Sequence, residues 1–357
     1  MRATTDEEVA LLAELVAIPS LSGNESAAVA HVERWCRSNG LPARVDRTGV
    51  FVELRGRTPG PTLALASHLD VVPAGDGWAR APFDARIEDG FLYGRGAGDA
   101  KASVTSMLLA ARDTAVAGGP ACGRLVVLLT LGEESRNPSM PEALEHAGPI
   151  DAAVIGEPTG LDIAVAQRGL VIAELRASGE QRHAGHAPRC GAQGAIETLA
   201  ADILKLGGLF ASRSHPVLGR TSATPTMLSG GISRNVTPPE AMATLDVRTT
   251  PDWTHDEVVS ELRSALRSEV RVVSDRLVPC RTPEGSRLLA CARAIRPASH
   301  TYASPTCSDW VFLRHADAIK CGPGNSELSH RPDECVSLQQ LIEARGFYTA
   351  LAREYLA

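Results

Sequence analysis

Residues 62–78 read TLALASHLDVVPAGDGW and join an apolar run to two polar side chains that can bind metal. Thr62–Ala66 is continuously apolar, which is typical of a strand buried on both faces. His68 and Asp70 follow it two residues apart, so they lie on the same side of an extended chain. By itself, such a pair at a strand end is more often a hydrogen-bonded turn than half of a metal site.

Similar apolar runs recur along the first half of the chain, at 125–131 and 152–155. A helical pattern that begins at Lys101 separates the first two runs, with apolar residues at i, i+3, i+4 and i+7. Buried strands that alternate with helices predict an α/β fold with a mostly parallel, mixed sheet flanked by helices.

The pattern changes near residue 170. GLVIAELRASG (169–179) and EAMATLDVRTT (240–250) alternate apolar and polar residues, as antiparallel strands with one buried face do. Helical patterns near 191–206 and 254–268 complete a β-α-β-β-α-β order, which predicts an inserted α+β domain of ferredoxin-like type. The expected organisation is a catalytic domain in two segments, 1–170 and 281–357, around an inserted lid or dimerisation domain, 171–280.

The composition excludes several classes of partner. A net charge of −6 over 357 residues argues against a general surface for nucleic acid or anionic membrane. The chain has neither a run of about 18 apolar residues nor a recognisable signal peptide, so we expect a cytoplasmic protein. Eight scattered cysteines form no C-x-x-C pair, and any metal ligands should therefore be histidine and carboxylates.

Polar residues follow each predicted strand of the first domain. Because the carboxyl ends of strands in an open α/β sheet gather the ligands, these residues are expected to meet at one edge. So many carboxylates would repel one another without a cation, and His with Asp and Glu favours a hydrolytic zinc, manganese or cobalt site. The residues are His68, Asp70, Asp99, Glu133, Glu134 and Glu157.

The segment GRGAGDAK (94–101) permits a second interpretation. A glycine-rich turn between a strand and a helix can cradle a phosphate. This segment lacks the G-x-G-x-x-G spacing and the P-loop lysine with its Ser/Thr, and Asp99 would bring a negative charge to the phosphate. Nucleotide binding is therefore disfavoured.

Taken in order along the chain, a set of short motifs resembles the dinuclear-zinc aminoacylase/peptidase superfamily. This superfamily includes acetylornithine deacetylase, succinyl-diaminopimelate desuccinylase, aminoacylase and related carboxypeptidases. The resemblance covers nearly the whole chain, and it is specific for the superfamily but only weakly specific for the substrate. Its motifs are SHLD, GRGAGDAK, LGEES, GEPT, RHAG, GGISRNV, DVR and GPGNSELSH.

The resemblance implies two divalent metal ions, zinc first, with cobalt or manganese as substitutes. Asp99 would bridge them, with His68 and Glu157 completing one site and Glu134 and His330 the other. It further implies that Glu133 is the general base of amide hydrolysis and that Asp70 orients His68, in agreement with the carboxylate that a neutral imidazole ligand usually needs.

The same resemblance assigns residues of the inserted domain. His183 would stabilise the oxyanion from across a homodimer interface, with His186 as a competing candidate. Arg248 would bind a substrate carboxylate bidentately. Further polar contacts are expected from Asn235, Asn325 and Arg168, although Arg168 is as well explained by an ordinary ion pair; Gln193 and Cys307 depart from the superfamily pattern.

The predicted function is hydrolysis of the N-acyl amide bond of a small N-acylated amino acid, closest to acetylornithine deacetylase and arginine biosynthesis. Alternatives are a desuccinylase, a dipeptidase or carboxypeptidase, and a hydrolase that releases lysine or ornithine from an amino-group carrier protein. The acidic balance of the chain disfavours an acidic carrier as partner. A non-enzymatic alternative is an inactive metal-binding homologue, which would have no need of the free carboxylate of Glu133.

Overall fold

The computed structural model describes residues 5–135 and 138–357, and it divides into two compact units. The first unit runs to Val165 and resumes with Arg281–Tyr302 and Ser308–Ala357. The second unit comprises Ala166–Cys280 together with the short segment Ala303–Cys307. No helix in the described ranges is long and apolar enough to cross a membrane.

The first unit is built on a nine-stranded sheet, counted over the described residues. Its centre is parallel: β3 (Thr58–His68) lies between β6 (Cys122–Thr130) and β7 (Ala152–Ile155), and β15 (Asp317–Lys320) follows β7. This confirms the mostly parallel, mixed sheet. The remaining strands are β1 (Ala43–Asp46), β2 (Gly49–Arg55), β8 (Ile163–Gln167), β13 (Cys280–Arg281) and β14 (Thr301–Ser304).

Helices bury this sheet on both faces, since every residue of Thr62–His68 is buried. Helix α3 (Lys101–Val116) packs against β3 and β6 on one side and against α9 (Leu338–Tyr355) on the other. Their contact forms the centre of the largest apolar core, with Leu65, Met107 and Phe347 among its members. The other helices of this unit are α1 (Thr5–Val16), α2 (Ser26–Ser38), α4 (Ser139–Ala147) and α8 (Arg287–Ile295).

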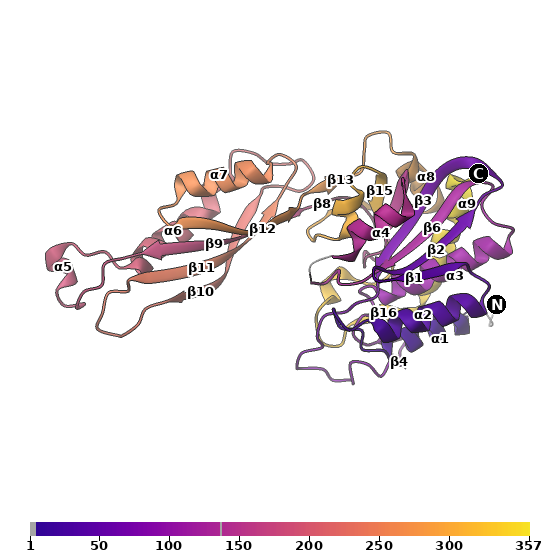
Figure 1. Ribbon diagram of the computed structural model, residues 1–357, viewed down its shortest axis with the longest axis horizontal. Coiled ribbons are helices and arrows are strands. Elements are labelled where there is room, and N and C mark those ends of the chain that lie inside the picture. The colour runs from indigo at the N-terminus through magenta and orange to yellow at the C-terminus, as the bar shows by residue number, and fades with distance from the viewer. Residues whose placement is uncertain (1–4, 136–137) are drawn as a thin grey trace. The chain divides into compact units, whose positions relative to one another are not determined.

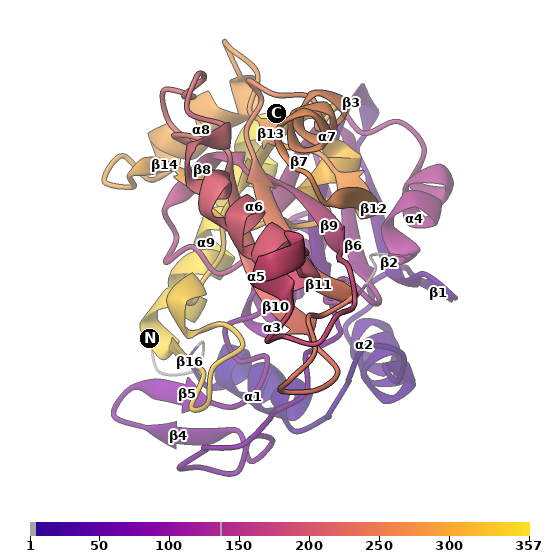
Figure 2. The ribbon, with the colours of Figure 1, turned by 90° about the vertical axis from the view of Figure 1, so that its left-hand side faces the viewer.

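A small antiparallel sheet of β16 (Cys335–Ser337), β5 (Phe91–Tyr93) and β4 (Arg86–Glu88) lies beside α1 (Figures 1 and 2). This corrects one expectation. The sequence placed Asp99 after a strand of the main sheet, but β5 belongs to the small sheet. Asp99 lies in the loop between β5 and α3. The FLY segment forms β5, which pairs with the short antiparallel strands β4 and β16 and therefore does not extend the main sheet.

The second unit is a four-stranded antiparallel sheet with helices on one face (Figure 1). The chain order β9-α6-β10-β11-α7-β12 is the predicted β-α-β-β-α-β order. Residues of β9 alternate between buried and half-buried, so only one face of this sheet is covered. The elements are β9 (Gly169–Ser178), α5 (Ala187–Cys190), α6 (Ala195–Leu209), β10 (Ser222–Gly230), β11 (Glu240–Thr249), α7 (His255–Ala265) and β12 (Glu269–Leu277).

Candidate metal centre

Three neighbouring strands of the main sheet end at the candidate site. His68 is the last residue of β3 and pairs in register with Thr130 at the end of β6. Glu133 and Glu134 follow β6 directly, and Glu157 follows β7 on the other side of β3. Because the three strands are parallel, their polar continuations meet at the same edge of the sheet.

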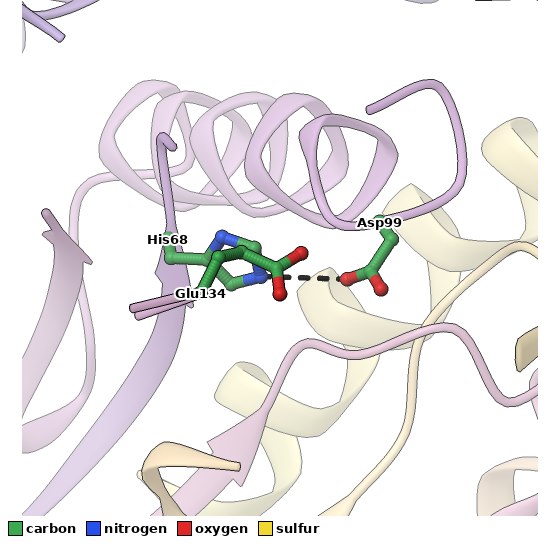
Figure 3. A group of neighbouring side chains, drawn as sticks. All are labelled: His68, Asp99 and Glu134. Atoms are coloured by element: carbon green, nitrogen blue, oxygen red, sulfur yellow. Dashed lines mark ion pairs between the residues drawn. The ribbon is translucent and has the colours of Figure 1, made fainter. Parts of the chain in front are cut away.

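The side chains of His68, Asp99 and Glu134 point toward one small space (Figure 3). Each offers one ligand atom, and these atoms all lie within 4.8 Å of one another. His68 Nε2 is 3.4 Å from Asp99 Oδ1 and 3.8 Å from Glu157 Oε1. Histidine and carboxylates without cysteine are the donors that suit catalytic zinc and related divalent ions.

The two carboxylate oxygens of Asp99 face different histidines. Oδ1 lies opposite His68, and Oδ2 is 3.7 Å from His330 Nε2. The same His330 nitrogen lies 2.9 Å from Glu134 Oε1. All five predicted ligands are thus linked by these contacts, with Asp99 between a pair formed by His68 and Glu157 and a pair formed by His330 and Glu134.

Crowding of carboxylates changes the proton affinities of this centre. Burial, followed by the negative charge of Asp99, raises the pKa of Glu157 to about 8. Burial and then the charge of Glu157 raise the pKa of Glu133 well above its ordinary value. Like charges held together in a buried place disfavour ionisation of Glu133 and Glu157 unless a cation is present.

Two atoms of the centre show that divalent ions fit it. His68 Nε2 and Asp99 Oδ1 are buried, and among the described residues neither has a hydrogen-bond partner. An unpartnered buried polar atom costs free energy, and here two of them face each other across 3.4 Å. A cation between them would satisfy both atoms and offset the repulsion among the carboxylates.

Asp70 contacts His68, as the sequence predicts, and it also holds the turn that carries Glu133 and Glu134. Its carboxylate accepts the backbone N–H of Glu133 and of Glu134, each at 3.0 Å, and the Ser22 hydroxyl at 2.7 Å. The acceptor nearest to His68 Nδ1 is the backbone oxygen of Asp70 at 3.0 Å, with the carboxylate at 3.5 Å. Burial alone would raise the pKa of Asp70, but the bonds from His68, Ser22 and the Glu134 amide lower it to about 2.

Sequence reasoning missed three residues that hold Asp99. The Ser329 hydroxyl donates to Asp99 Oδ2, and Glu334 accepts the Asp99 N–H at 2.9 Å. Arg95 pairs with Glu334, and both side chains are only 1% exposed. The sequence carried a signal for two of them. Glu334 lies four positions after the predicted ligand His330, and Arg95 lies four positions before the predicted ligand Asp99.

Within the second unit, the predicted residues separate into two groups. His183 and Asn235 lie at one end of the sheet, beyond Ser178 and Glu240, where His183 forms a β-bridge with Val236. Both predicted residues are exposed. The His183 ring stands 5.5 Å from that of His186, so either histidine remains a candidate from position alone.

Arg168 and Arg248 lie at the opposite end of β9 and β11, where Arg248 pairs with Leu170. The Arg248 guanidinium binds the Asp246 carboxylate through two bonds of 2.7 and 3.0 Å and contacts Cys307 Sγ at 3.8 Å. Arg168 donates to three backbone carbonyls on two segments. These are the carbonyls of Leu218, Arg220 and Arg248.

The last two predicted positions have local contacts. Asn325 caps the short helix η2 (Ser326–Leu328) by accepting the Glu327 N–H at 2.9 Å. Gln193 is exposed, and its backbone oxygen accepts the Glu180 N–H. Neither contact involves another predicted site residue.

Comparisons with known proteins identify the family of this chain. The model of peptidase family M20/M25/M40 matches residues 64–354. A succinyl-diaminopimelate desuccinylase of Cereibacter sphaeroides is 29% identical, covering 98% of this chain and 99% of that protein. A protein of Aeropyrum pernix named for hydrolysis of LysW-lysine and LysW-ornithine is 28% identical over 95% of this chain and 93% of its own length.

Solved structures share the fold. The metallo-carboxypeptidase Sso-CP2 of Sulfolobus solfataricus has a TM-score of 0.82 at 20% identity and covers 98% of this chain and 99% of that one. The YXEP protein of Bacillus subtilis, described as a dinuclear metal binding peptidase, has a TM-score of 0.76 at 17% identity, with 99% and 98% covered. The chain belongs to peptidase family M20/M25/M40 and is a metallo-hydrolase of amide bonds.

Proposed function

We propose that this enzyme cleaves the N-acyl amide bond of a small N-acylated amino acid at a centre of two divalent ions. The observation that carries the proposal is the position of Asp99, whose two oxygens face His68 and His330 separately. In the proposal, His68 and Glu157 hold one ion, and His330 and Glu134 hold the other. Zinc is the first candidate metal, with cobalt or manganese as substitutes.

Two such ions, when bound, lower the pKa of a water molecule and polarise the amide carbonyl. The chain itself supplies the group that moves protons, which we assign to Glu133. Its carboxylate takes a proton from the attacking water and returns it to the leaving amine. Burial and the charge of Glu157 raise the pKa of Glu133 in the metal-free chain, and two bound ions would counteract this rise and keep the carboxylate ionised, ready to accept a proton.

Asp70 positions this base, in our proposal. Its carboxylate accepts the amides of both Glu133 and Glu134 and so fixes the turn that carries them. The side chains of adjacent residues in such a turn diverge, which lets Glu134 bind an ion while Glu133 remains free. Asp70 also stays ionised at any working pH, because its pKa is about 2.

Recognition of the amino-acid carboxylate is assigned to Arg248. Its planar guanidinium can bind a carboxylate bidentately, and it already binds Asp246 in this way. Arg168 donates to the Arg248 carbonyl, so we propose that it positions this strand in addition to any contact with substrate. Asn235 and Asn325 remain candidates for further polar contacts.

His183 is proposed as the donor to the oxyanion, acting from a second copy of the chain. His183 and Arg248 lie at opposite ends of β9 and β11, which pair over ten residues, or roughly 30 Å of strand. One small substrate cannot contact both side chains of the same copy. A homodimer removes the conflict, because Arg248 and His183 at one site would come from different protomers.

The second unit has a surface suited to such a homodimer. Strand β10 lies at the edge of the sheet, with Met227 and Leu228 exposed by 68% and 70%. A groove of about 300 Å³ lies between β10 and α6, lined by Ile196, Leu199 and Leu228 among others. An unprotected edge strand beside an apolar groove favours pairing with a second copy of the same edge.

Three kinds of acyl group compete in this proposal. The sequence motifs favour an acetylated diamino acid, as in acetylornithine deacetylase. The names of the relatives favour a succinylated substrate or an amino acid bound to a carrier protein. All of these substrates share an amide bond beside an amino acid that carries a free carboxylate.

A hydrolysis panel tests the proposal. The enzyme is loaded with zinc or cobalt and offered acetylornithine, acetylcitrulline, succinyl-diaminopimelate, a set of dipeptides and a lysine-conjugated carrier protein. Release of a free amine by wild-type protein, but not by a Glu133→Ala control, supports the function and identifies the acyl group. Metal binding without turnover on any member would instead support the inactive homologue.

A further inference from the structure

Glu334 forms a buried anchor beneath the candidate metal centre. Its carboxylate is 1% exposed and accepts four donors from one short loop. Oε1 accepts the backbone N–H of Gly98 and of Asp99, each at 2.9 Å. Oε2 accepts the Gly96 N–H at 3.2 Å and the Arg95 guanidinium at 2.6 Å.

The shape of the glycine-rich loop explains why its amides converge. Gly96 has a φ of +83°, and a side chain there would also meet Val71 at 2.6 Å. Successive N–H groups in such a turn form a concave nest that binds an anion. The loop therefore cradles an anion as a phosphate-binding turn would, but the anion is the chain's own Glu334 carboxylate.

The anchor acts on two of the proposed ligands. Asp99 is held directly through its N–H, while its oxygens face His68 and His330. His330 lies four residues before Glu334 in the same loop, is half exposed, and has a strained φ of +63°. Its ring pairs with two carboxylates of the centre, those of Asp99 and Glu134, and the segment that carries it is held by anchors such as Glu334.

We propose that Glu334 is a positioning residue that sets Asp99 and His330 for metal binding. It touches neither substrate nor ion, and it acts by fixing the backbone of the proposed bridging ligand from 235 residues further along the chain. The inference rests on the proposed metal centre. According to this inference, Glu334 contributes to the affinity for the ions although it is not itself a ligand.

A matched control stands beside Glu334. Asp333 also accepts backbone amides, those of Ala79 and Arg80, at 3.2 to 3.3 Å. It belongs to the same segment, but within the described ranges the backbone amides that its carboxylate accepts are those of residues 79 and 80 and not those of the glycine-rich loop. Asp333→Asn therefore removes a similar clamp without disturbing the glycine-rich loop.

The experiment compares wild type, Glu334→Gln and Asp333→Asn as metal-free proteins titrated with cobalt. Calorimetry gives the affinities, and the visible absorption of bound cobalt reports its coordination. We expect Glu334→Gln to bind cobalt about 10- to 100-fold more weakly with an altered spectrum, as loss of a residue that orients ligands does, and Asp333→Asn to match wild type. Gln keeps the size of the side chain but turns an N–H₂ group toward donors.

Each outcome is decisive. A folded Glu334→Gln variant with wild-type affinity and spectrum would overturn the positioning role. Failure of wild-type protein to bind cobalt would instead overturn the metal centre itself. If Glu334→Gln does not fold, Glu334→Asp keeps the charge beside Arg95 but withdraws it from the amides, and the same weakening is expected; wild-type affinity in that variant would refute the inference.

Discussion

The predicted functional residues lie close together in the first unit and far apart in the second. In the first unit, residues from five separate parts of the chain converge, and three of them, His68, Asp99 and Glu134, place ligand atoms within 4.8 Å of one another. In the second unit, His183 and Arg248 lie at opposite ends of one sheet. Buried carboxylates anchor the first group through backbone amides, whereas the second group is exposed or half-exposed.

This difference indicates a division of labour. The groups that would activate water must keep fixed distances, and parallel strand ends with buried anchors provide such rigidity. The groups proposed to bind the substrate lie far apart in the second unit, and in the proposal they act together only in a homodimer. Substitutions in the metal centre of the first unit should therefore cost much activity. The role of residues in the second unit should become visible only when dimers are formed or mixed.

The largest effect is expected at Glu133. Glu133→Gln removes the proton acceptor but keeps the size of the side chain and the hydrogen bond from the backbone N–H of residue 133 to Asp70. We expect kcat to fall by about 1,000-fold or more while cobalt affinity and the thermal midpoint stay near wild type. Steady-state kinetics and a cobalt titration measure the two quantities, and near-normal turnover would exclude Glu133 as the base.

His183 gives the next largest effect and tests the comparison directly. His183→Ala should lose about 100-fold in kcat, the typical cost of one donor to an oxyanion. Mixed with Glu133→Ala protein under conditions of subunit exchange, it should regain about a quarter of wild-type activity, because each mixed dimer holds one intact site.

Leu228→Glu, on the exposed edge strand β10, supplies the control for this mixing experiment. It should yield a monomer in sedimentation analysis and abolish the regain. If exchange is demonstrated and no activity returns, His183 does not act across an interface. The distance between His183 and Arg248 would then not reflect a site shared by two protomers.

A smaller effect is expected at Arg248. Arg248→Lys keeps the positive charge but loses the planar fork, so KM should rise about tenfold with little change in kcat. A substrate analogue that lacks the carboxylate should show no difference between the two proteins. A fall in kcat with an unchanged KM would remove Arg248 from substrate binding.

The smallest effect concerns stability and pH in the first unit. Without metal, Glu157 has a pKa of about 8 and Glu133 one well above its ordinary value. Between pH 5 and 7 the folded state therefore binds more protons than the unfolded chain, and the free energy of unfolding falls as pH rises. Bound zinc keeps these carboxylates ionised and should remove that fall.

Thermal midpoints measured at pH 5 and pH 7, with zinc or with a chelator, test this. We expect zinc to raise the midpoint by a few degrees more at pH 7 than at pH 5. Burial lowers the pKa of His31 and of His255, which makes the free energy of unfolding rise with pH. This contribution is the same with zinc and with chelator, so it cancels when the two midpoints are compared. Equal stabilisation at the two pH values would contradict the crowding of carboxylates.

Much of the fold could be predicted from periodicity. The apolar run at 62–66 became the centre of β3, and the alternating segments from 169 and 240 became β9 and β11, because burial on one or two faces dictates the pattern. Asp99 was misplaced, since three residues of strand in β5 cannot reveal which sheet they join.

By itself, the sequence determined which residues can bind metal and that three of them follow strands, since residue type and strand periodicity are local properties. Only the tertiary structure decided that Asp99 presents one oxygen to each histidine, that Asp70 holds the amides of Glu133 and Glu134, and that Glu334 fills the glycine-rich loop. These contacts join residues 31 to 236 positions apart, and their formation depends on packing that no local pattern records.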